Sequence, residues 1–315
     1  MSKLTPLPQT ESRPSSEAAG GAPLVILNPA GGRGAARRLH GPIERALAGG
    51  RGELVVTRAP GEAARLAEEA ARAGRDVVVV GGDGTLNEAA GGILASERPS
   101  RLGIVPAGTG NDYAYETLKL PREPLAALEV ALTGQPVAMD VGEVNGRHFL
   151  NSLGVGIDAN IAAAAEHLKR LPFMAGETLY WTASLSELVF HYNRCPQLTV
   201  TYDEQVVPSQ LFALAAVSIG PTYGGGFRIN PGADPTDGYF DLCTITKPAW
   251  LRALRLLPMV EKGQHLDQPE VSRRRVRDII LEAHHPIHAH LDGEVITARR
   301  FEARILPAAL LVRRA

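Results

Sequence analysis

Eight consecutive residues, Gly81 to Glu88, read Gly-Gly-Asp-Gly-Thr-Leu-Asn-Glu and directly follow a run of valines. The β-branched run predicts a buried strand over Val77–Val80, and the glycines predict a tight turn after it. Backbone N–H groups of that turn, and of a helix predicted from Thr85 to Leu94, suit a phosphate anion. The carboxylates of Asp83 and Glu88 would repel such an anion unless a metal ion or a reacting hydroxyl lies between them. The octapeptide therefore predicts nucleotide phosphate handling.

Two better-known phosphate loops are excluded. A P-loop requires a lysine and a hydroxyl residue after its last glycine, and no glycine of this chain is followed by that pair. The dinucleotide fingerprint fails because its last glycine position is occupied by Asn87. A turn with a purely structural role is the remaining alternative, but such a turn does not need Asp, Asn and Glu together.

Two further loops follow predicted strands in the same way. Asn28–Gly32 follows the apolar run Leu24–Leu27, and Pro106–Asp112 follows Leu102–Val105. Strands that alternate with helices predict βαβ units and a parallel sheet, whose ligands bind at the carboxyl ends of the strands. All three glycine-bearing loops therefore fall at one edge of the sheet.

The elements that position these loops divide the chain in two. Residues 23–134 predict an α/β nucleotide-binding domain, and residues 135–315 predict a β-rich sandwich domain that opens with a hairpin at Asn145-Gly146. Whether the last strand returns to the first domain is left open. The strands expected in the second domain are Val137–Val144, Arg147–Leu153, Gln197–Tyr202, Leu211–Ile219, Tyr239–Thr246, Val276–Glu282, Ile287–Leu291 and Phe301–Leu306. The helices expected there are Asp158–Arg170, Glu177–Tyr192 and Ala249–Met259.

Charge and composition narrow the class of protein. With 33 basic and 34 acidic residues, no global field favours a nucleic acid partner. Cys195 and Cys243 lack metal or redox spacing, which is typical of a reducing compartment. Residues 1–22 are rich in Ser, Pro, Glu and Gly and lack the apolar region of a signal peptide, so a disordered tail is expected. Without a run of about 18 apolar residues, we expect a cytoplasmic protein.

The three loops together carry a family resemblance. Asn-Pro-x-x-Gly-Gly from Asn28, the octapeptide from Gly81, and Pro-x-Gly-Thr-x-Asn-Asp from Pro106 resemble, in this order, the diacylglycerol kinase catalytic domain. The soluble bacterial lipid kinases are the most similar group, with sphingosine kinases and, more distantly, NAD kinases as relatives. The resemblance runs from Leu24 to the C-terminus. It implies an α/β ATP-binding domain, a β-sandwich domain, and an active site in the cleft between them that uses ATP and Mg²⁺.

The same resemblance implies which residues bind ATP. These residues are Asn28, Pro29, Ala30, Gly31, Gly32, Thr57, Gly81, Gly82, Asp83, Gly84, Thr85, Leu86, Asn87, Glu88, Gly108 and Thr109. The assignment of Thr57 rests on spacing alone.

A later segment, Asp234-Pro235-Thr236-Asp237-Gly238-Tyr239, resembles the structural magnesium loop of the family. There Asp237 would supply a carboxylate, and Asp234 and Tyr239 would supply backbone carbonyls. Oxygen ligands on a tight loop suit a hard cation. Taken without the resemblance, the segment is better explained as an Asp-Gly turn before a strand.

Asp292-Gly293-Glu294 reads by itself as a hairpin turn. In the family, the matching glutamate accepts a proton and the matching aspartate lies beside the phosphates. Glu294 is therefore the expected general base, while Asp292 and Asp83 are expected to hold the catalytic Mg²⁺ or to orient the hydroxyl. The alternative, which follows the usual assignment in sphingosine kinases, makes Asp83 the base.

These features predict an ATP- and Mg²⁺-dependent kinase for a hydroxyl of a diacylglycerol-like lipid. One rival is an NAD kinase, but there the Asn-Glu pair lies in a separate downstream motif, whereas Asn87-Glu88 is fused to the octapeptide here. The other rival is a nucleotide-binding regulator without turnover, which would be expected to lack one of the acids Asp83, Asp292 and Glu294.

Three further features leave alternatives open. His284, His288 and His290 would share one face of a strand and could hold zinc, although solvated or phosphate-neighbouring histidines are favoured. The segment Trp250–Leu257, with Arg273–Arg275 after it, fits a peripheral contact with the inner membrane face or, as favoured, a packed amphipathic helix. The family resemblance also implies a homodimer formed through the sandwich.

Overall fold

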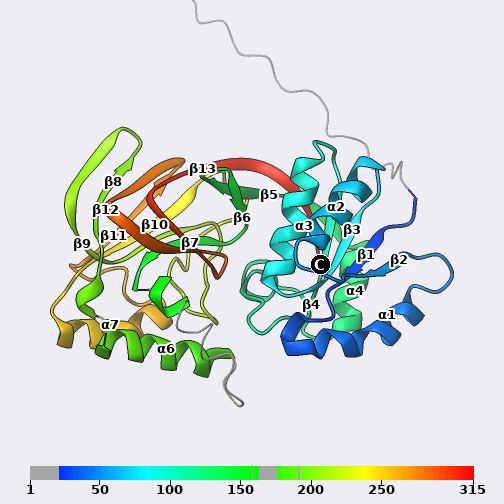
Figure 1. Cartoon of the computed structure of the whole chain (residues 1–315), viewed down its shortest axis with the longest axis horizontal. Helices are drawn as coiled ribbons and strands as arrows, with labels where there is room; N and C mark the ends of the chain where they lie inside the picture. Colours follow the sequence, from blue (N-terminus) through cyan, green and yellow to red (C-terminus); the bar gives the residue numbers. More distant parts are fainter. Residues whose placement is uncertain (1–20, 158, 163–175, 191) are drawn as a thin grey trace, which may run out of the picture.

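The computed structural model describes residues 21–157, 159–162, 176–190 and 192–315, which form two lobes side by side (Figure 1). In the first lobe, a parallel sheet in the order β4-β3-β1-β2 lies between two layers of helices. Its elements are β1 (Leu24–Leu27), η1 (Gly31–Leu39), α1 (His40–Ala46), β2 (Glu53–Val56), α2 (Glu62–Arg72), β3 (Val77–Gly81), α3 (Asp83–Ala95), β4 (Arg101–Pro106), η2 (Tyr113–Thr117) and α4 (Pro124–Thr133).

Burial on both faces explains why these strands are continuously apolar. Val77 and Val79 pack toward α2 and α3, whereas Val78 and Val80 pack toward α1 and α4. Alternate side chains of a strand point to opposite faces, so a sheet covered on both sides needs apolar residues at every position. The α/β class predicted for this lobe is confirmed.

The second lobe is built from strands that fold over a common apolar core. Its strands are β5 (Gln135–Val144), β6 (Arg147–Phe149), β7 (Ser152–Gly156), β8 (Gln197–Tyr202), β9 (Gln205–Ser218), β10 (Phe240–Thr246), β11 (Val271–Val276), β12 (Asp278–Leu291) and β13 (Glu294–Arg314), with helices α6 (Gly176–Phe190) and α7 (Trp250–Glu261) and the turn η3 (Tyr192–Arg194). Phe149 of β6 stacks on Phe240 of β10, with ring centroids 5.6 Å apart. Because these two strands are not neighbours in the sheet, the sheet closes on itself as a sandwich.

One long strand joins the two lobes. The first half of β13 pairs with β12, and its last residues pair antiparallel with β5 and parallel with β4 at Leu311 and Val312. A change of register between Leu306 and Leu310, with Ala308 at φ 54°, lets the strand bend from one lobe to the other. The hydrogen-bonded sheet of the described residues therefore runs through both lobes (Figure 1).

Buried Asp140 on β5 fixes this bend. Its Oδ1 accepts the N–H of Ala308 at 2.8 Å, and its Oδ2 accepts the N–H of Gly238 at 2.7 Å. Its own N–H donates to the carbonyl of Pro235 at 2.8 Å. One carboxylate thus connects the strand shared by the lobes with the loop before β10.

The strand boundaries differ from the expectation at several places. Among them, β9 begins at Gln205 rather than Leu211, and β11 was not expected. The expected strands Val276–Glu282 and Ile287–Leu291 are one strand, β12, with an irregularity between Glu282 and Ile287. The expected Phe301–Leu306 is only the centre of β13, and the expected Arg147–Leu153 is divided between β6 and β7. Irregular register interrupts the alternation of polar and apolar residues on which strand prediction rests.

Two expectations fall largely outside the described residues. The tail 1–22 is described only from residue 21, and the helix expected at Asp158–Arg170 is described only at 159–162, which are helical. Among the helices that the structure describes, none is both long enough and apolar enough to cross a membrane.

Replacing Asp140 with alanine should destabilise the fold. The buried N–H groups of Gly238 and Ala308 would lose their acceptor, which lowers the free energy of unfolding by about 2–4 kcal/mol. Denaturant unfolding measures the change. Asp278→Ala, at an exposed position at the start of β12, is the matched control and should change stability little. Equal losses in both variants would contradict the role assigned to Asp140.

Candidate active site

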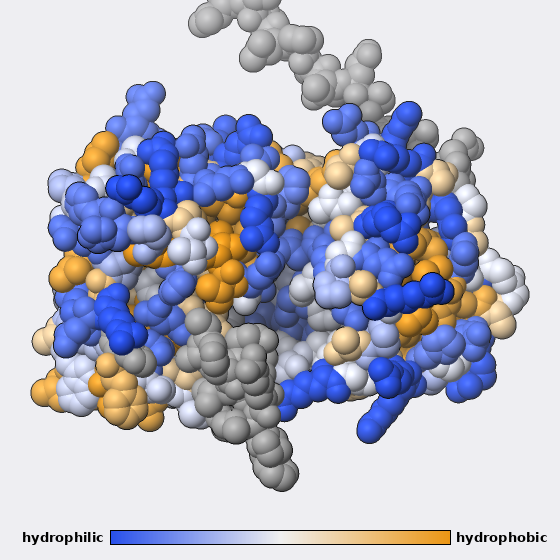
Figure 2. Space-filling model, in the orientation of Figure 1, coloured by the Kyte–Doolittle hydropathy of each residue, from blue (hydrophilic) through white to orange (hydrophobic). Residues whose placement is uncertain are grey.

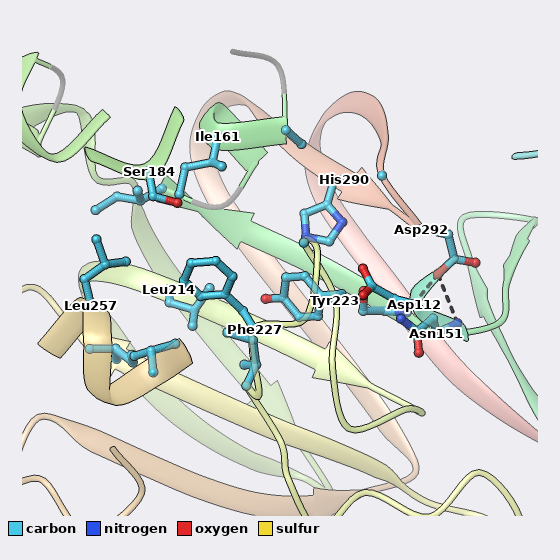
Figure 3. Close-up of a pocket in the computed structure, with 18 of the residues that line it drawn as sticks. Asp112, Asn151, Ile161, Ser184, Leu214, Tyr223, Phe227, Leu257, His290 and Asp292 are labelled. Carbon is cyan, nitrogen blue, oxygen red and sulfur yellow. Dashed lines mark hydrogen bonds between the residues drawn. The ribbon is translucent and has the colours of Figure 1, made fainter. Parts of the chain in front are cut away.

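A cavity extends from the first lobe into the second. It encloses about 1270 Å³ of non-atom space, including its open mouth. At one end it is lined by acidic residues of both lobes, and at the other by apolar side chains of the second lobe. Figure 3 shows the sequence of side chains along it: Leu257, Leu214 and Phe227, then Tyr223 and His290, then Asp112, Asn151 and Asp292.

The apolar part lies between the sheet and the two helices of the second lobe. Ser184 and Leu188 face it from α6, Ala253, Leu256 and Leu257 face it from α7, and the sheet contributes Leu214 and Ile245. Apart from Ser184, these residues belong to, or pack against, one apolar cluster. Ile161 and Ala162 also line the cavity, while residues 163–175 lie outside the described part.

Three carboxylates from distant parts of the sequence gather at the polar end. Asp83 begins α3, Asp112 follows β4, and Asp292 occupies the turn between β12 and β13. Each accepts backbone N–H groups, which fixes its direction. Asn111 donates to Asp83 at 3.0 Å, and Gly225 donates to Asp112 at 2.8 Å.

Asp292 is held more firmly than the other two. Its Oδ2 accepts the N–H of Leu150 at 2.7 Å, and its Oδ1 accepts the N–H groups of Asn151 at 3.0 Å and Ser152 at 2.8 Å. A left-handed backbone at Asp292, with φ 48°, followed by Gly293 at φ 90°, makes the tight turn that aims it there. Asp292 therefore organises residues 150–152 as well as facing the cavity.

Burial disfavours the charged forms of these acids, and repulsion by the other two adds to this effect at Asp83. Burial, followed by the charge of Asp112, raises the pKa of Asp83 from 3.8 to about 7, and Asp292 adds to the rise. Burial also raises the pKa values of Asp112 and Asp292, against the opposing effect of their backbone hydrogen bonds. A bound cation, or a proton shared between carboxylates, would offset the unfavourable negative charge at this end of the cavity.

The glycine loops of the first lobe pack directly on one another beside these acids. A Cβ added at Gly108 would lie 2.5 Å from the Cα of Gly82, and one at Gly32 would lie 2.6 Å from the carbonyl oxygen of Ala107. Only glycine permits such close backbone approach. No side chain caps the first turn of α3 after Gly82, so its N–H groups point at this edge as an anion site.

The residues predicted to bind ATP differ in where the structure places them. Asn28 donates to Thr85 Oγ1 at 2.8 Å and accepts the N–H of Ala30 at 3.0 Å, so Asn28 and Thr85 brace the loops. Leu86 lines the cavity and packs in the core. Thr57 is buried at the end of β2 and donates its N–H to Leu27. The structure brings the remaining members to the same edge of the sheet: Pro29, Gly31, Gly32, Gly81, Gly82, Gly84, Asn87, Glu88, Gly108 and Thr109 lie on or directly after these loops.

Glu294, the expected base, lies at the rim rather than in the cavity. Its side chain is 64% exposed and pairs with Arg147, with Nη2 and Oε2 2.8 Å apart. Its neighbour Gly293 lines the cavity, but Glu294 does not. Its role stays a prediction.

The expected magnesium loop is closed by its own side chains. Asp234 accepts the N–H and the hydroxyl of Thr236, at 3.0 and 2.7 Å. Asp237 accepts the N–H of Tyr239 and pairs with Arg275, whose guanidinium lies over the Tyr239 ring. A cation at Asp237 would have to displace Arg275, so magnesium binding by this loop also stays a prediction.

The histidine cluster does not converge on one point. His284, His285 and His288 are exposed, whereas His290 is buried in the cavity with its ring 4.9 Å from that of Tyr223. Among the described residues, no group of three or more His, Cys, Asp or Glu side chains is arranged to hold a metal ion.

Sequence reasoning missed three contributors to the site. Asp112 ends the third motif but is not among the predicted site residues, although it closes the acid cluster. Tyr113, next to it, is buried with a hydroxyl that has no hydrogen-bond partner, and it lines the cavity. Tyr223 lies in a glycine-rich segment, Tyr223–Gly226, which gave the only signal.

The family of the chain follows from comparison with known proteins. Residues 22–144 match the diacylglycerol kinase catalytic domain, and residues 151–314 match the YegS C-terminal NAD kinase beta sandwich-like domain. The chain belongs to the diacylglycerol kinase catalytic domain family, in its YegS-like bacterial lipid kinase branch. The resemblance found in the motifs is confirmed.

Individual relatives cover nearly the whole chain. A diacylglycerol kinase of Mycobacterium tuberculosis strain H37Rv is 33% identical over 92% of this chain and 94% of its own length. A diacylglycerol kinase of Bacillus subtilis strain 168 is 27% identical over 86% of this chain and 88% of its own length. The crystal structure of a diacylglycerol kinase from Bacillus anthracis strain Sterne superposes with a TM-score of 0.71 at 20% identity, over 95% of this chain and 98% of that one. The last likeness shows the fold.

The raised pKa of Asp83 predicts a pH-dependent stability difference. Because the folded chain holds this proton more tightly, the stability linked to it is complete below the unfolded value of 3.8 and is lost as the pH rises through about 7. Asp83→Asn removes that loss. We expect the variant and the parent to melt alike near about pH 4, and the variant to melt at a higher temperature at about pH 8.

Thermal melting across this pH range measures the difference. Asp203→Asn, in the turn between β8 and β9, is the matched control, because asparagine tolerates the positive φ of Asp203. A gap between Asp83→Asn and the parent that does not widen with pH would contradict the burial of a carboxylate at this position.

Proposed function

We propose that the chain is an ATP- and Mg²⁺-dependent lipid kinase that transfers the γ-phosphoryl group to a hydroxyl of a diacylglycerol-like lipid. One observation carries the proposal: a single cavity joins an acidic end at the glycine loops to an apolar end in the second lobe. The first end suits a nucleotide triphosphate and the second suits an acyl chain. The relatives named diacylglycerol kinase support the same activity.

The chain's own groups would position the phosphates. The N–H groups of Gly31 and Gly108 themselves donate to Asn28 and Asn111. The donors for phosphate would therefore be other N–H groups of these loops, of Gly82 and of the first turn of α3. Asn28 and Thr85 hold two of these loops in register. Positioning and electrostatic stabilisation are the main protein contributions to phosphoryl transfer, so a rigid set of donors is the appropriate machinery.

The acid cluster fits a magnesium ion. Mg²⁺ binds through one or two carboxylates together with phosphate oxygens and waters, so a cage of three protein ligands is not required. Asp83 and Asp112 have the oxygen donors and the repulsion that such an ion would relieve. When bound, the ion offsets the negative charge of the phosphates. Asp292 is committed to three backbone N–H groups and is better suited to shaping the site.

The general base is proposed to be Glu294, with Asp83 as the alternative. Glu294 lies two residues from Asp292 at the mouth of the cavity, and its partner Arg147 is exposed enough to release it. Asp83, with a pKa of about 7, has the proton affinity of a base, but a bound cation would lower that pKa.

The lipid acceptor is tested with labelled ATP, Mg²⁺ and a panel of acceptors in mixed micelles. We expect phosphorylation of a diacylglycerol-like lipid and no phosphorylation of NAD. Phosphorylation of NAD would instead indicate an NAD kinase. Ala253→Leu, which fills the apolar cavity from α7, should lower kcat/KM for long-chain lipids about tenfold and spare short-chain ones. Absence of transfer to every lipid would favour a nucleotide-binding regulator without turnover.

The base assignment is tested with Glu294→Gln and Asp83→Asn. Loss of Glu294 as base should lower kcat by about 10²–10⁴ and leave the Kd for ATP unchanged. Asp83→Asn should instead weaken Mg²⁺ binding, so that a higher Mg²⁺ concentration is needed for the half-maximal rate. Arg147→Gln is the control, since it removes the partner of Glu294 and keeps the carboxylate. Normal turnover in Glu294→Gln would transfer the role to Asp83.

A further inference from the structure

The outer sides of α6 and α7 expose an unusual share of large apolar residues. Five of the eight large hydrophobic side chains found exposed in the described part of the chain lie there. We call them the α6–α7 face: Leu185, Val189, Phe190, Trp250 and Leu251. Phe190 is 75% exposed and Leu251 is 65% exposed. In Figure 2, pale orange and orange atoms show at the lower left, where Figure 1 draws these helices.

Hydrogen bonds hold the two helix ends that carry this face side by side. The indole N–H of Trp250, at the start of α7, donates to the carbonyl of Leu188 near the end of α6, at 2.8 Å. The hydroxyl of Tyr192, just after α6, donates to the carbonyl of Pro248 at 2.6 Å. The exposed residues of the two helices are therefore neighbours and form one surface.

The same helices form the wall of the apolar cavity. Leu188 lines the cavity one residue before the exposed Val189, and Ala253 lines it two residues after the exposed Leu251. A single layer of helix thus separates the cavity from the α6–α7 face.

The charges around the face are basic. Arg194 and Arg255 are exposed beside it, and Lys247 is half-buried over the Tyr192 ring. Of the acids near these helices, Glu187 of α6 is buried, and Glu270 is paired with Arg252 of α7 at 2.9 Å. Exposed apolar side chains with a tryptophan and flanking cations are the features of a surface that binds anionic bilayers.

We propose that the α6–α7 face docks the protein on a bilayer containing anionic lipids, so that the lipid acceptor enters the cavity from the membrane. The purpose of this docking rests on the proposed lipid kinase function, whereas vesicle binding can be measured without any turnover. Insertion of Phe190 and Leu251 supplies apolar burial, and Arg194, Lys247 and Arg255 supply attraction to anionic headgroups. A second copy of this chain is the competing occupant. The cationic margin disfavours it, because a symmetric pairing would bring these cations together.

Vesicle co-sedimentation tests the docking directly. The parent chain is expected to bind phosphatidylcholine vesicles that contain phosphatidylglycerol, and to bind pure phosphatidylcholine vesicles more weakly. The double variant Phe190→Glu, Leu251→Glu should lose at least about tenfold in partition coefficient. Arg255→Ala should lose about fivefold on anionic vesicles and little on neutral ones.

The matched control is Val206→Glu, which places the same charge at an exposed apolar residue of the β8–β9 hairpin, away from α6 and α7 (Figure 1). It should bind vesicles like the parent. On a short-chain, monomeric lipid the double variant should retain parental turnover, which also shows that it is folded, whereas turnover on vesicle-borne lipid should fall with binding.

Three results would overturn the proposal. They are parental vesicle binding by the double variant, equal losses in Val206→Glu, and a change of oligomeric state in size-exclusion chromatography without a change in vesicle binding. The last result would identify the face as an interface between copies. Vesicle binding needs no turnover, so an inactive chain that still docks through this face would overturn the kinase function and leave the docking surface intact.

Discussion

The pairing of β13 with strands of both lobes is the constraint on which the site depends. Its start continues the turn that carries Asp292, and its end pairs with β4, whose following loop carries Asp112. The distance between these acids is therefore set by a continuous ladder of hydrogen bonds. Asp140 reinforces the point where that ladder bends. A hinge at this position would separate the acids, and the ladder resists such a hinge.

The acid end is electrostatically unfavourable by itself, and this property has a functional use. Burial raises the pKa of each of the three carboxylates, and for Asp83 repulsion by Asp112 and Asp292 adds to the rise. The fold accepts this cost because each carboxylate is directed by backbone N–H groups. Such an arrangement is pre-organised for a divalent cation and for phosphate oxygens, both of which remove the repulsion.

The second lobe adds an apolar space to the acidic end of the cavity. Its sheet and helices α6 and α7 enclose an apolar space that opens toward the acids. Tyr223 and His290 lie at the junction, where a lipid headgroup would meet the phosphates (Figure 3). The same helices also expose apolar residues outward, so one layer of helix lies between this space and the α6–α7 face.

The sequence by itself determined the local chemistry. Runs such as Val77–Val80 predict buried strands, and glycines after them predict phosphate loops, because the conformational needs of a turn and of close approach depend on neighbouring residues alone. The order of the three motifs also indicated the family. The close backbone contact between Gly82 and Gly108 agrees with the prediction that these loops lie together at one edge of the sheet.

Only the tertiary structure decided which of these groups meet. The convergence of Asp112 with Asp83 and Asp292, the exposure of Glu294, and the burial of His290 but not of His284, His285 and His288 depend on strand register and on a bend at Ala308. A register shift moves side chains to another face without any change in local sequence pattern. The glycine loops are thus determined by consecutive residues and could be predicted from the sequence. The acid cluster and the cavity depend on contacts such as Leu150 with Asp292 and Asp112 with Gly225, which join residues more than a hundred positions apart.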